Sequence, residues 1–254
     1  MSPVDRLVSL IAPTSLEADQ YRALRHTIER RHRESGFQVF GVTSPGASEG
    51  KTVTTLNLAG SLAQARQSRV LVADADFHRP SVGNYLGLAP NRPGLAETIV
   101  NADAGPLDAV QQPNGSNLSV LSSGVDRSGV YELLNAPRFG TLVQAWRQDF
   151  DYVLIDTPPL VPLPDCRLLS QWVDGFIIVV AAHKTPRRML GEALRLVDPA
   201  KIVGTVFNGD DRPLSPYSSY YGYAPTPVIP KRSAGPKPGW WSRALKRNGQ
   251  RGRS

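Results

Sequence analysis

The chain has 254 residues, which is enough for one sizeable α/β domain with additional terminal segments. Its net charge of +7 is unevenly spread, because eight basic residues and no acidic residue lie in 231–254, so the rest of the chain is nearly neutral. This distribution indicates a basic tail and argues against a nucleic-acid-binding fold. The sequence contains neither a long apolar membrane span nor a signal peptide, so we expect a cytoplasmic protein whose single cysteine, Cys166, has a structural or incidental role.

A charged helix is the first element that the sequence predicts, over residues 15–34, with Ser15 as a candidate N-cap. After it, apolar β runs alternate with helical segments. Strands are predicted at 37–44, 69–76, 118–124, 151–159, 174–182 and 201–208. Helices are predicted at 51–66, 129–147 and 185–197, with an interruption near Pro137 and a further short helix near the end of 77–100.

The β runs are continuously apolar rather than alternating, which is typical of strands that are covered on both faces. Their alternation with helices predicts an α/β fold with a mostly parallel, twisted sheet flanked by helices. Near residue 210 the pattern stops and the chain becomes rich in Pro, Ser and Gly, so we expect a largely disordered tail. The predicted organisation is a helical segment at 1–35, an α/β domain at 36–209 and a tail at 210–254.

A phosphate-binding turn is predicted at Ser44 to Thr52, where TSPGASEGKT lies between a strand and a helix. The glycines let the backbone approach an anion, and the N–H groups at the start of the helix point toward it. Lys51 would reach the β- and γ-phosphates, and the Thr52 hydroxyl would bind Mg²⁺. Pro45 stands where the usual motif has its first glycine, so a glycine-rich loop that only turns the chain is the alternative. The residues expected to bind the nucleotide are Pro45, Gly46, Ser48, Glu49, Gly50, Lys51, Thr52 and Val53.

Three aspartates are predicted to lie near this turn. Asp74 and Asp76 follow one apolar strand and Asp156 ends another, and in an open parallel sheet ligands bind at the carboxyl ends of the strands. Carboxylates there can hold Mg²⁺ and accept a proton, although a solvated turn is an equal alternative for Asp74 and Asp76 alone. The candidate catalytic residues are Lys51, Asp74 and Asp76, and the candidate metal ligands are Thr52, Asp76 and Asp156.

Together, TSPGASEGKT, VLVADADFHRP, DYVLIDTPP and the earlier DQYRALR resemble the bacterial tyrosine kinases (BY-kinases) that regulate capsule and exopolysaccharide synthesis, within the MinD/ParA-like P-loop ATPases. The resemblance runs from Thr14 to Asn208. The other branches usually carry a second lysine where this chain has Gly46, which disfavours a DNA-binding partitioning ATPase. The resemblance implies ATP and Mg²⁺ as cofactors and Asp74 as the base for the tyrosine hydroxyl. It also implies that Asn208 contacts the nucleotide base, with a strand-end turn residue as an equal alternative.

One position departs from the family pattern D-x-D-x-R. At the position of the arginine this chain has His78, and Arg79 follows it. Either Arg79 replaces the arginine or phosphoryl transfer is slower. The alternative function is therefore a non-kinase, ATP-switched assembly ATPase that controls the oligomerisation of a polysaccharide export complex.

The resemblance also implies a homo-oligomer, since the family uses an E-x-x-R-x-x-R helix pattern in subunit contacts. Here the pattern reads Asp19, Arg22 and Arg25, and a solvated helix face is the alternative. Family members of this form work with a separate membrane activator, a polysaccharide co-polymerase, and phosphorylate a C-terminal tyrosine cluster in a neighbouring subunit. The matching tyrosines are Tyr217, Tyr220, Tyr221 and Tyr223, half of the 8 in the chain, and a low-complexity segment is the alternative.

The basic end of the chain contains the pair Trp240 and Trp241. Indole rings and basic side chains suit an anionic membrane surface, although a solubilising tail is an equal alternative. We therefore expect a cytoplasmic protein-tyrosine autokinase that lies peripherally at the inner face of the plasma membrane and has no nucleic-acid partner.

Overall fold

A computed structural model describes residues 3–65, 67–113, 117–125 and 129–210. The described residues up to Asn208 belong to one compact unit. The predicted tyrosine cluster at 217–223 and the basic segment 231–254 lie outside the described residues. No helix within the described ranges is both long and apolar enough to cross a membrane.

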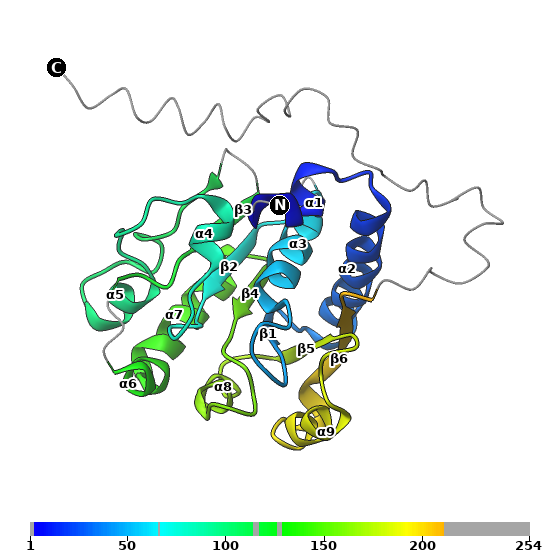
Figure 1. Cartoon of the computed structure of the whole chain (residues 1–254). Helices are drawn as coiled ribbons and strands as arrows, with labels where there is room; N and C mark the ends of the chain where they lie inside the picture. Colours follow the sequence, from blue (N-terminus) through cyan, green and yellow to red (C-terminus); the bar gives the residue numbers. More distant parts are fainter. Residues whose placement is uncertain (1–2, 66, 114–116, 126–128, 211–254) are drawn as a thin grey trace. The chain divides into compact units, whose positions relative to one another are not determined.

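A six-stranded sheet is the centre of this unit, and all five strand pairings are parallel (Figure 1). The strand order is β3-β2-β4-β1-β5-β6. The strands are β1 (Val39–Thr43), β2 (Val70–Asp74), β3 (Leu118–Leu121), β4 (Tyr152–Asp156), β5 (Gly175–Ala181) and β6 (Ile202–Asn208). All residues of β1 to β4 are buried, as their continuous apolar runs predict. The predicted parallel α/β fold is confirmed.

Helices cover both faces of this sheet. They are α1 (Val8–Ile11), α2 (Leu16–Ser35), α3 (Lys51–Ala63), α4 (Val82–Leu86), α5 (Leu95–Val100), α6 (Val130–Asn135), α7 (Pro137–Asp149), α8 (Asp165–Leu169) and α9 (Arg187–Arg195), with short 3₁₀ helices at Pro3–Arg6 and Pro199–Lys201. Neighbouring strand residues belong to separate core clusters: Leu71 belongs to the cluster that contains Phe139 and Trp146, whereas Val72 belongs to the cluster that contains Ile28 and Leu56. Helices α2 and α3 therefore cover one face and α7 covers the other.

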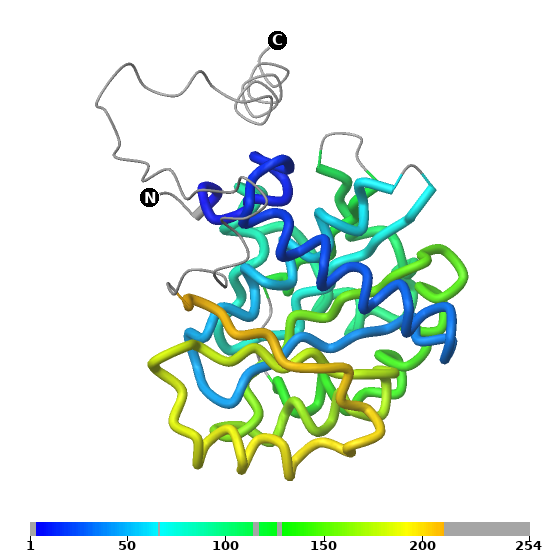
Figure 2. Tube along the Cα trace, turned by 90° about the vertical axis from the view of Figure 1, so that its right-hand side faces the viewer, coloured from blue at the N-terminus to red at the C-terminus, as the bar shows by residue number. Residues whose placement is uncertain are grey.

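The first long helix begins and ends through local signals in the sequence. The Ser15 side chain caps α2 by accepting a hydrogen bond from the backbone N–H of Ala18. Gly36 ends the helix in the left-handed conformation, with φ of 69°. Figure 2 shows α2 lying beside β6, the edge strand of the sheet. The predicted helix at 15–34 is confirmed, as is the interruption at Pro137, which is the first residue of α7.

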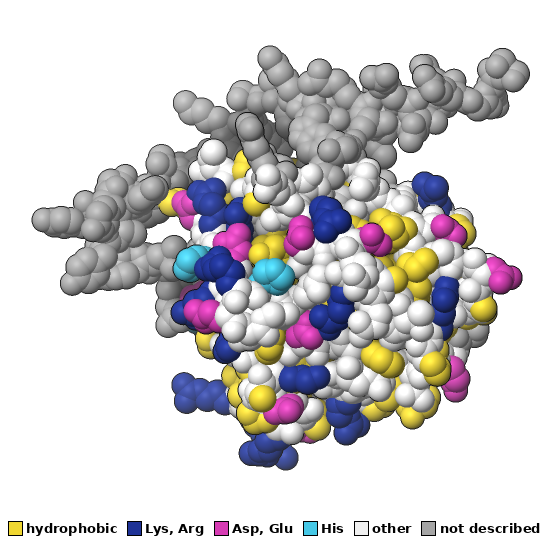
Figure 3. All heavy atoms as spheres, turned by 180° about the vertical axis from the view of Figure 1, so that it is seen from behind, with side chains coloured by type: hydrophobic (Ala, Val, Ile, Leu, Met, Phe, Trp, Pro, Cys, Tyr) yellow, Lys and Arg dark blue, Asp and Glu magenta, His cyan; other side chains and the backbone are white. Residues whose placement is uncertain are grey.

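The carboxyl ends of the central strands meet at one edge of the sheet. Asp156 at the end of β4 is in register with Asp74 at the end of β2 and with Val42 of β1. This register brings the predicted phosphate-binding turn and the predicted acidic residues to the same edge. On the face of the molecule seen in Figure 3, basic and acidic side chains are interspersed, which agrees with the nearly neutral charge of the chain before residue 231.

Candidate active site

The turn between β1 and α3 has the backbone geometry of a phosphate-binding loop. Gly50 is left-handed, with φ of 98°, and a Cβ atom there would lie 1.9 Å from the side-chain nitrogen of Asn208. Ser48 is also left-handed, with φ of 58°. Lys51 is the first residue of α3, so the unpaired N–H groups of the helix N-terminus lie directly after the turn. Of the predicted nucleotide-binding residues, Pro45 to Gly50 form the turn, and Lys51, Thr52 and Val53 form the first turn of α3.

The segment after β4 holds the beginning of this turn in place. The backbone N–H of Leu160 donates to the Ser44 carbonyl at 2.9 Å, and that of Val161 donates to the Pro45 carbonyl at 3.2 Å. A proline at position 45 has no N–H of its own to donate, but its carbonyl is available for this contact. The departure from the usual glycine is therefore compatible with a well-ordered turn.

Side chains from the far edge of the sheet hold the end of the turn. The amide of Asn208 donates to the Glu49 carbonyl at 2.9 Å, and the Lys184 ammonium donates to the Ser48 carbonyl at 3.1 Å. The Thr185 hydroxyl donates to the Glu49 carboxylate at 2.8 Å. Sequence reasoning did not identify Lys184 or Thr185, because nothing local marks them. Asn208, predicted to contact the nucleotide base, lies against the phosphate-binding turn.

Lys51 is buried, as are Asp74 at the end of β2 and Asp76 just after it. The Lys51 ammonium is 3.8 Å from the Asp76 carboxylate. The Asp74 side chain accepts hydrogen bonds from the backbone N–H groups of Asp76, Ser81 and Val82, at 3.2, 3.0 and 3.1 Å. Asp74 is only 1% exposed, and burial, together with the nearby Asp156 carboxylate, raises its pKa well above the ordinary value.

Asp156 is the most deeply buried of the acids. The Thr52 hydroxyl donates to its Oδ2 at 2.5 Å, and the Ser81 hydroxyl lies 2.7 Å from the Thr52 hydroxyl. Burial raises the pKa of Asp156 to about 7, against the lowering effects of the Thr52 hydrogen bond and the Lys51 charge. Its other oxygen, Oδ1, is buried and has no hydrogen-bond partner.

An unpartnered buried carboxylate oxygen beside two hydroxyls fits a hard cation or a cation-bound water. Among the described residues, no group of three His, Cys, Asp or Glu side chains is arranged as a metal site by itself. Mg²⁺ typically uses one or two carboxylates and completes its shell with water and substrate phosphates. Thr52, Asp76 and Asp156 therefore suit a metal ion that arrives with the nucleotide.

His78, at the position of the family's arginine, contacts a residue far away in the sequence. Its Nε2 lies 2.6 Å from the carboxylate of Asp165, the first residue of α8. The side chain of His78 is 39% exposed and that of Asp165 is 7% exposed. Sequence reasoning did not single out Asp165. Arg79, named above as a replacement for the arginine, has an exposed side chain.

The predicted subunit-contact residues divide into two kinds. Asp19 and Arg22 form an ion pair with each other, and both side chains are exposed. Arg25 is half-buried and bonded within its own chain, since it donates to the Ser61 carbonyl at 2.9 Å and to Glu29 at 2.7 Å. A contact with a second copy therefore stays a prediction, and Asp19 and Arg22 are its more accessible members.

Cys166 is buried near the site between two threonines. Its sulfur lies 3.4 Å from the Thr43 hydroxyl and 3.5 Å from the Thr157 hydroxyl. Burial raises the pKa of the thiol. These surroundings favour the inert thiol and agree with the expected structural role.

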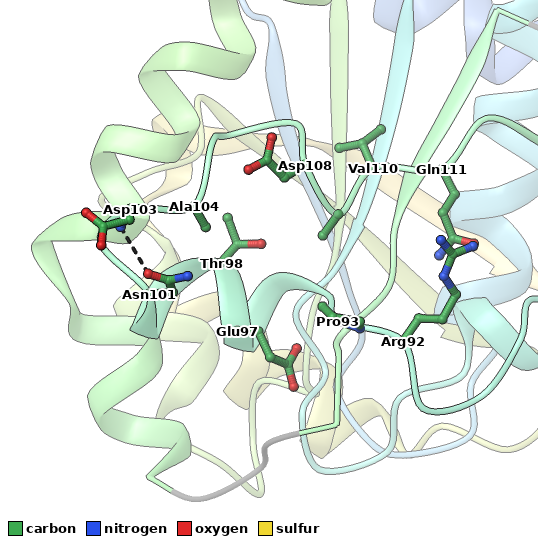
Figure 4. Close-up of a pocket in the computed structure, with 11 residues that line it drawn as sticks. Arg92, Pro93, Glu97, Thr98, Asn101, Asp103, Ala104, Asp108, Val110 and Gln111 are labelled. Atoms are coloured by element: carbon green, nitrogen blue, oxygen red, sulfur yellow. Dashed lines mark hydrogen bonds between the residues drawn. The ribbon is translucent and has the colours of Figure 1, made fainter.

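A separate hollow of about 470 Å³ lies beside α5 and the loop that follows it (Figure 4). The Glu97 carboxylate at its wall accepts the backbone N–H groups of Gly94 and Val125, and Asp108 accepts that of Gly105. These acids therefore hold the loops around the hollow. None of the predicted site residues lines it.

Comparisons with known proteins agree with this geometry. The AAA domain family model matches residues 45–192. Tyrosine-protein kinase YwqD of Bacillus subtilis (strain 168) is 31% identical over 219 residues, which cover 85% of this chain and 90% of that protein. Succinoglycan biosynthesis transport protein ExoP of Rhizobium meliloti (strain 1021) is 30% identical over 229 residues, which cover 87% of this chain but 29% of that protein. The crystal structure of the chimerical protein CapA2B2 superposes with a TM-score of 0.74 at 26% identity, over 82% of this chain and 91% of that one.

Proposed function

Because the chain belongs to the bacterial tyrosine kinases, within the MinD/ParA-like P-loop ATPases, we propose that it is an ATP-dependent protein-tyrosine autokinase that regulates capsule or exopolysaccharide synthesis and export. The observation that carries the proposal is the convergence of Lys51, Asp76, Asp156 and Thr52 at one edge of the sheet, directly behind a phosphate-binding turn. The names of two relatives support it, one as a tyrosine kinase and the other as a polysaccharide transport protein.

In this proposal the turn binds the phosphates of ATP through its backbone N–H groups, and the Lys51 ammonium neutralises charge on the β- and γ-phosphates. Thr52, Asp76 and Asp156 hold Mg²⁺, which when bound supplies positive charge to the phosphates during transfer. Asn208 supports the turn by donating its amide N–H to the Glu49 carbonyl.

The proposed reaction transfers the γ-phosphoryl group to a tyrosine. The bond between the γ-phosphorus and the β–γ bridging oxygen breaks, a bond to the tyrosyl oxygen forms, ADP leaves, and Asp74 takes the phenolic proton. The raised pKa of Asp74 makes it a better proton acceptor than an exposed aspartate. Asp74 is only 1% exposed, so side chains around it must move before the tyrosine hydroxyl can reach it.

The test is to incubate the full chain with Mg-ATP, with and without a cytosolic fragment of the membrane activator, and to locate phosphotyrosine by mass spectrometry. We expect labelling at Tyr217, Tyr220, Tyr221 and Tyr223. The matched control replaces all four by phenylalanine, which should abolish the labelling and leave ATP binding intact. If ATP binds but no phosphotyrosine forms with the activator present, the kinase proposal fails and the ATP-switched assembly ATPase takes its place.

The same assay tests transfer between copies. A Lys51→Met chain with intact tyrosines serves as acceptor, and the four-phenylalanine chain serves as enzyme. We propose that the acceptor becomes labelled in the mixture, through a homo-oligomer that uses Asp19 and Arg22. Labelling confined to a chain that carries both Lys51 and the tyrosines would contradict transfer in trans.

We further propose a separate membrane activator and a peripheral location at the inner face of the plasma membrane. The basic segment 231–254 would bind anionic lipid, at about 1 kcal/mol for each basic residue near the surface. The full chain should therefore co-sediment with vesicles that contain phosphatidylserine and should bind phosphatidylcholine vesicles more weakly. If deletion of 231–254 leaves the binding to phosphatidylserine vesicles unchanged, the tail is not the anchor.

A further inference from the structure

The loop between β2 and α4, residues 75–81, determines where the Asp76 carboxylate lies. Its inner side is fixed, because the backbone N–H groups of Asp76 and Ser81 donate to the Asp74 carboxylate. The Phe77 side chain adds a second anchor, since it is buried in the core. These contacts hold the base of the loop and leave its exposed tip to be held by something else.

The tip is held by His78. The 2.6 Å contact between its Nε2 and Asp165 joins residues that are 87 positions apart in the sequence. The side chain of Asp165 is only 7% exposed, and a carboxylate that is buried to this extent needs a hydrogen-bonding partner. The imidazole of His78 supplies that partner while its outer side still faces solvent.

Asp165 belongs to a segment that is itself attached to the phosphate-binding turn. The backbone N–H groups of Leu160 and Val161 donate to the carbonyls of Ser44 and Pro45, five and four residues before Asp165. The contact with His78 therefore joins the loop that carries the candidate metal ligand to the segment that supports the phosphate site. This pair bridges the two halves of the site on the outside, and the Ser81 hydroxyl, 2.7 Å from the Thr52 hydroxyl, joins the loop to α3 on the inside.

We propose that His78 and Asp165 form a positioning pair that holds residues 75–81 so that the Asp76 carboxylate stays beside the Lys51 ammonium. Within this pair, His78 stands at the position where the family pattern has an arginine. Arg79 does not take this part: its backbone N–H donates to Asp76, and its side chain is exposed. The inference rests on the proposed kinase function, because phosphoryl transfer is its main readout.

The experiment is a double-mutant cycle on the full chain, with kcat and KM for ATP measured from phosphotyrosine formation. His78→Ala and Asp165→Asn should each lower kcat about ten- to a hundredfold, because a displaced catalytic group slows transfer more than it weakens binding. KM for ATP should change by no more than about twofold, since the turn and Lys51 are untouched. The double variant should be no slower than the slower single variant.

Rescue by arginine separates a positioning role from a general structural one. His78→Arg should keep most of the wild-type kcat, because a guanidinium can also donate to Asp165. The same change in the Asp165→Asn chain should give no recovery. The controls are Arg79→Ala, in the same loop, and Asp103→Asn, at the separate hollow, and both should stay near wild type. Losses that multiply in the double variant, or a larger loss for Arg79→Ala than for His78→Ala, would overturn the inference.

Hydrogen exchange gives a readout that does not depend on kinase activity. In Asp165→Asn, the amides of residues 76–79 and 81 should exchange faster, whereas those of residues 51–56 in α3 should not change. If wild-type protein binds ATP but forms no phosphotyrosine, the proposed kinase function fails. Hydrogen exchange then still tests whether His78 and Asp165 hold the loop. Unchanged exchange in 76–81 would show that the pair does not hold the loop.

Discussion

Replacing Lys51 by methionine should lower the rate of phosphotyrosine formation by about a hundred- to a thousandfold, as removal of one charge-stabilising group from a preorganised site does elsewhere. Lys51 is buried at the start of α3, and its ammonium lies 3.8 Å from the Asp76 carboxylate. Methionine keeps most of the apolar stem but removes the charge, so the fold should persist while the phosphates lose their cation. The measurements are initial rates of labelling and the affinity for ATP.

Lys201→Met is the matched control for this change. The Lys201 ammonium donates to the carbonyl of Val173, far from the phosphate-binding turn in the sequence, and also contacts the carbonyl of Ser170. Its loss should lower the melting temperature and leave the labelling rate per folded molecule within about twofold. A Lys51→Met chain that binds ATP and forms phosphotyrosine at the wild-type rate would show that the phosphates lie elsewhere.

Asp156→Asn should have opposite effects on activity and on stability. Activity should fall by about a hundredfold or more, because Mg²⁺ loses a carboxylate ligand and the charge that stabilises its binding. The metal-free protein should become more stable at pH 8, because a buried charge is removed while an oxygen remains to accept the Thr52 hydroxyl. The expected gain is up to about 4 kcal/mol, less the cost of burying the new amide.

The sign of the pH dependence follows from the raised pKa of Asp156. Between its ordinary value of 3.8 and about 7, the folded protein keeps the proton that the unfolded chain has lost. The resulting stability is fully present below the unfolded pKa and is lost as the pH rises through about 7. Metal-free wild type should therefore be less stable at pH 8 than at pH 5, and Asp156→Asn should reduce this difference.

Denaturant unfolding in EDTA at both pH values measures these differences. Some pH dependence should persist in Asp156→Asn, because the pKa of Asp74 is also raised, although less so once the Asp156 charge is removed. Addition of Mg-ATP should stabilise wild type more than the variant, since a ligand stabilises the state that binds it. Equal stability gains for the two proteins would show that Asp156 takes no part in metal binding.

The sequence predicted those parts of the fold that neighbouring residues determine. Six continuous apolar runs gave six strands, and the structure confirms the helix start marked by Ser15 and the interruption marked by Pro137. The phosphate-binding turn was recognisable because glycines and a lysine at fixed spacing lie between a strand and a helix. The helices α1, α4 and α8, of four or five residues, were missed, because such short segments carry no measurable periodicity.

The remaining features depend on contacts between distant segments, which a single sequence does not specify. His78 was recognised as unusual, but its partner Asp165 comes from a segment that follows a different strand. In the same way, Arg25 was expected to face a second subunit, and the structure adds its hydrogen bond to the Ser61 carbonyl. Only the order of the strands and the packing of α2 on α3 bring these groups together.

The burial of Cys166 gives the protein a built-in reporter of its own opening. It is the single thiol in the chain, it is fully buried, and burial raises its pKa, so an alkylating reagent should modify it only in molecules that have opened. Its alkylation rate therefore measures how often this part of the molecule opens. A cysteine introduced on the surface would be the only readily reactive thiol in the native protein, so a fluorophore can be attached there without removing Cys166.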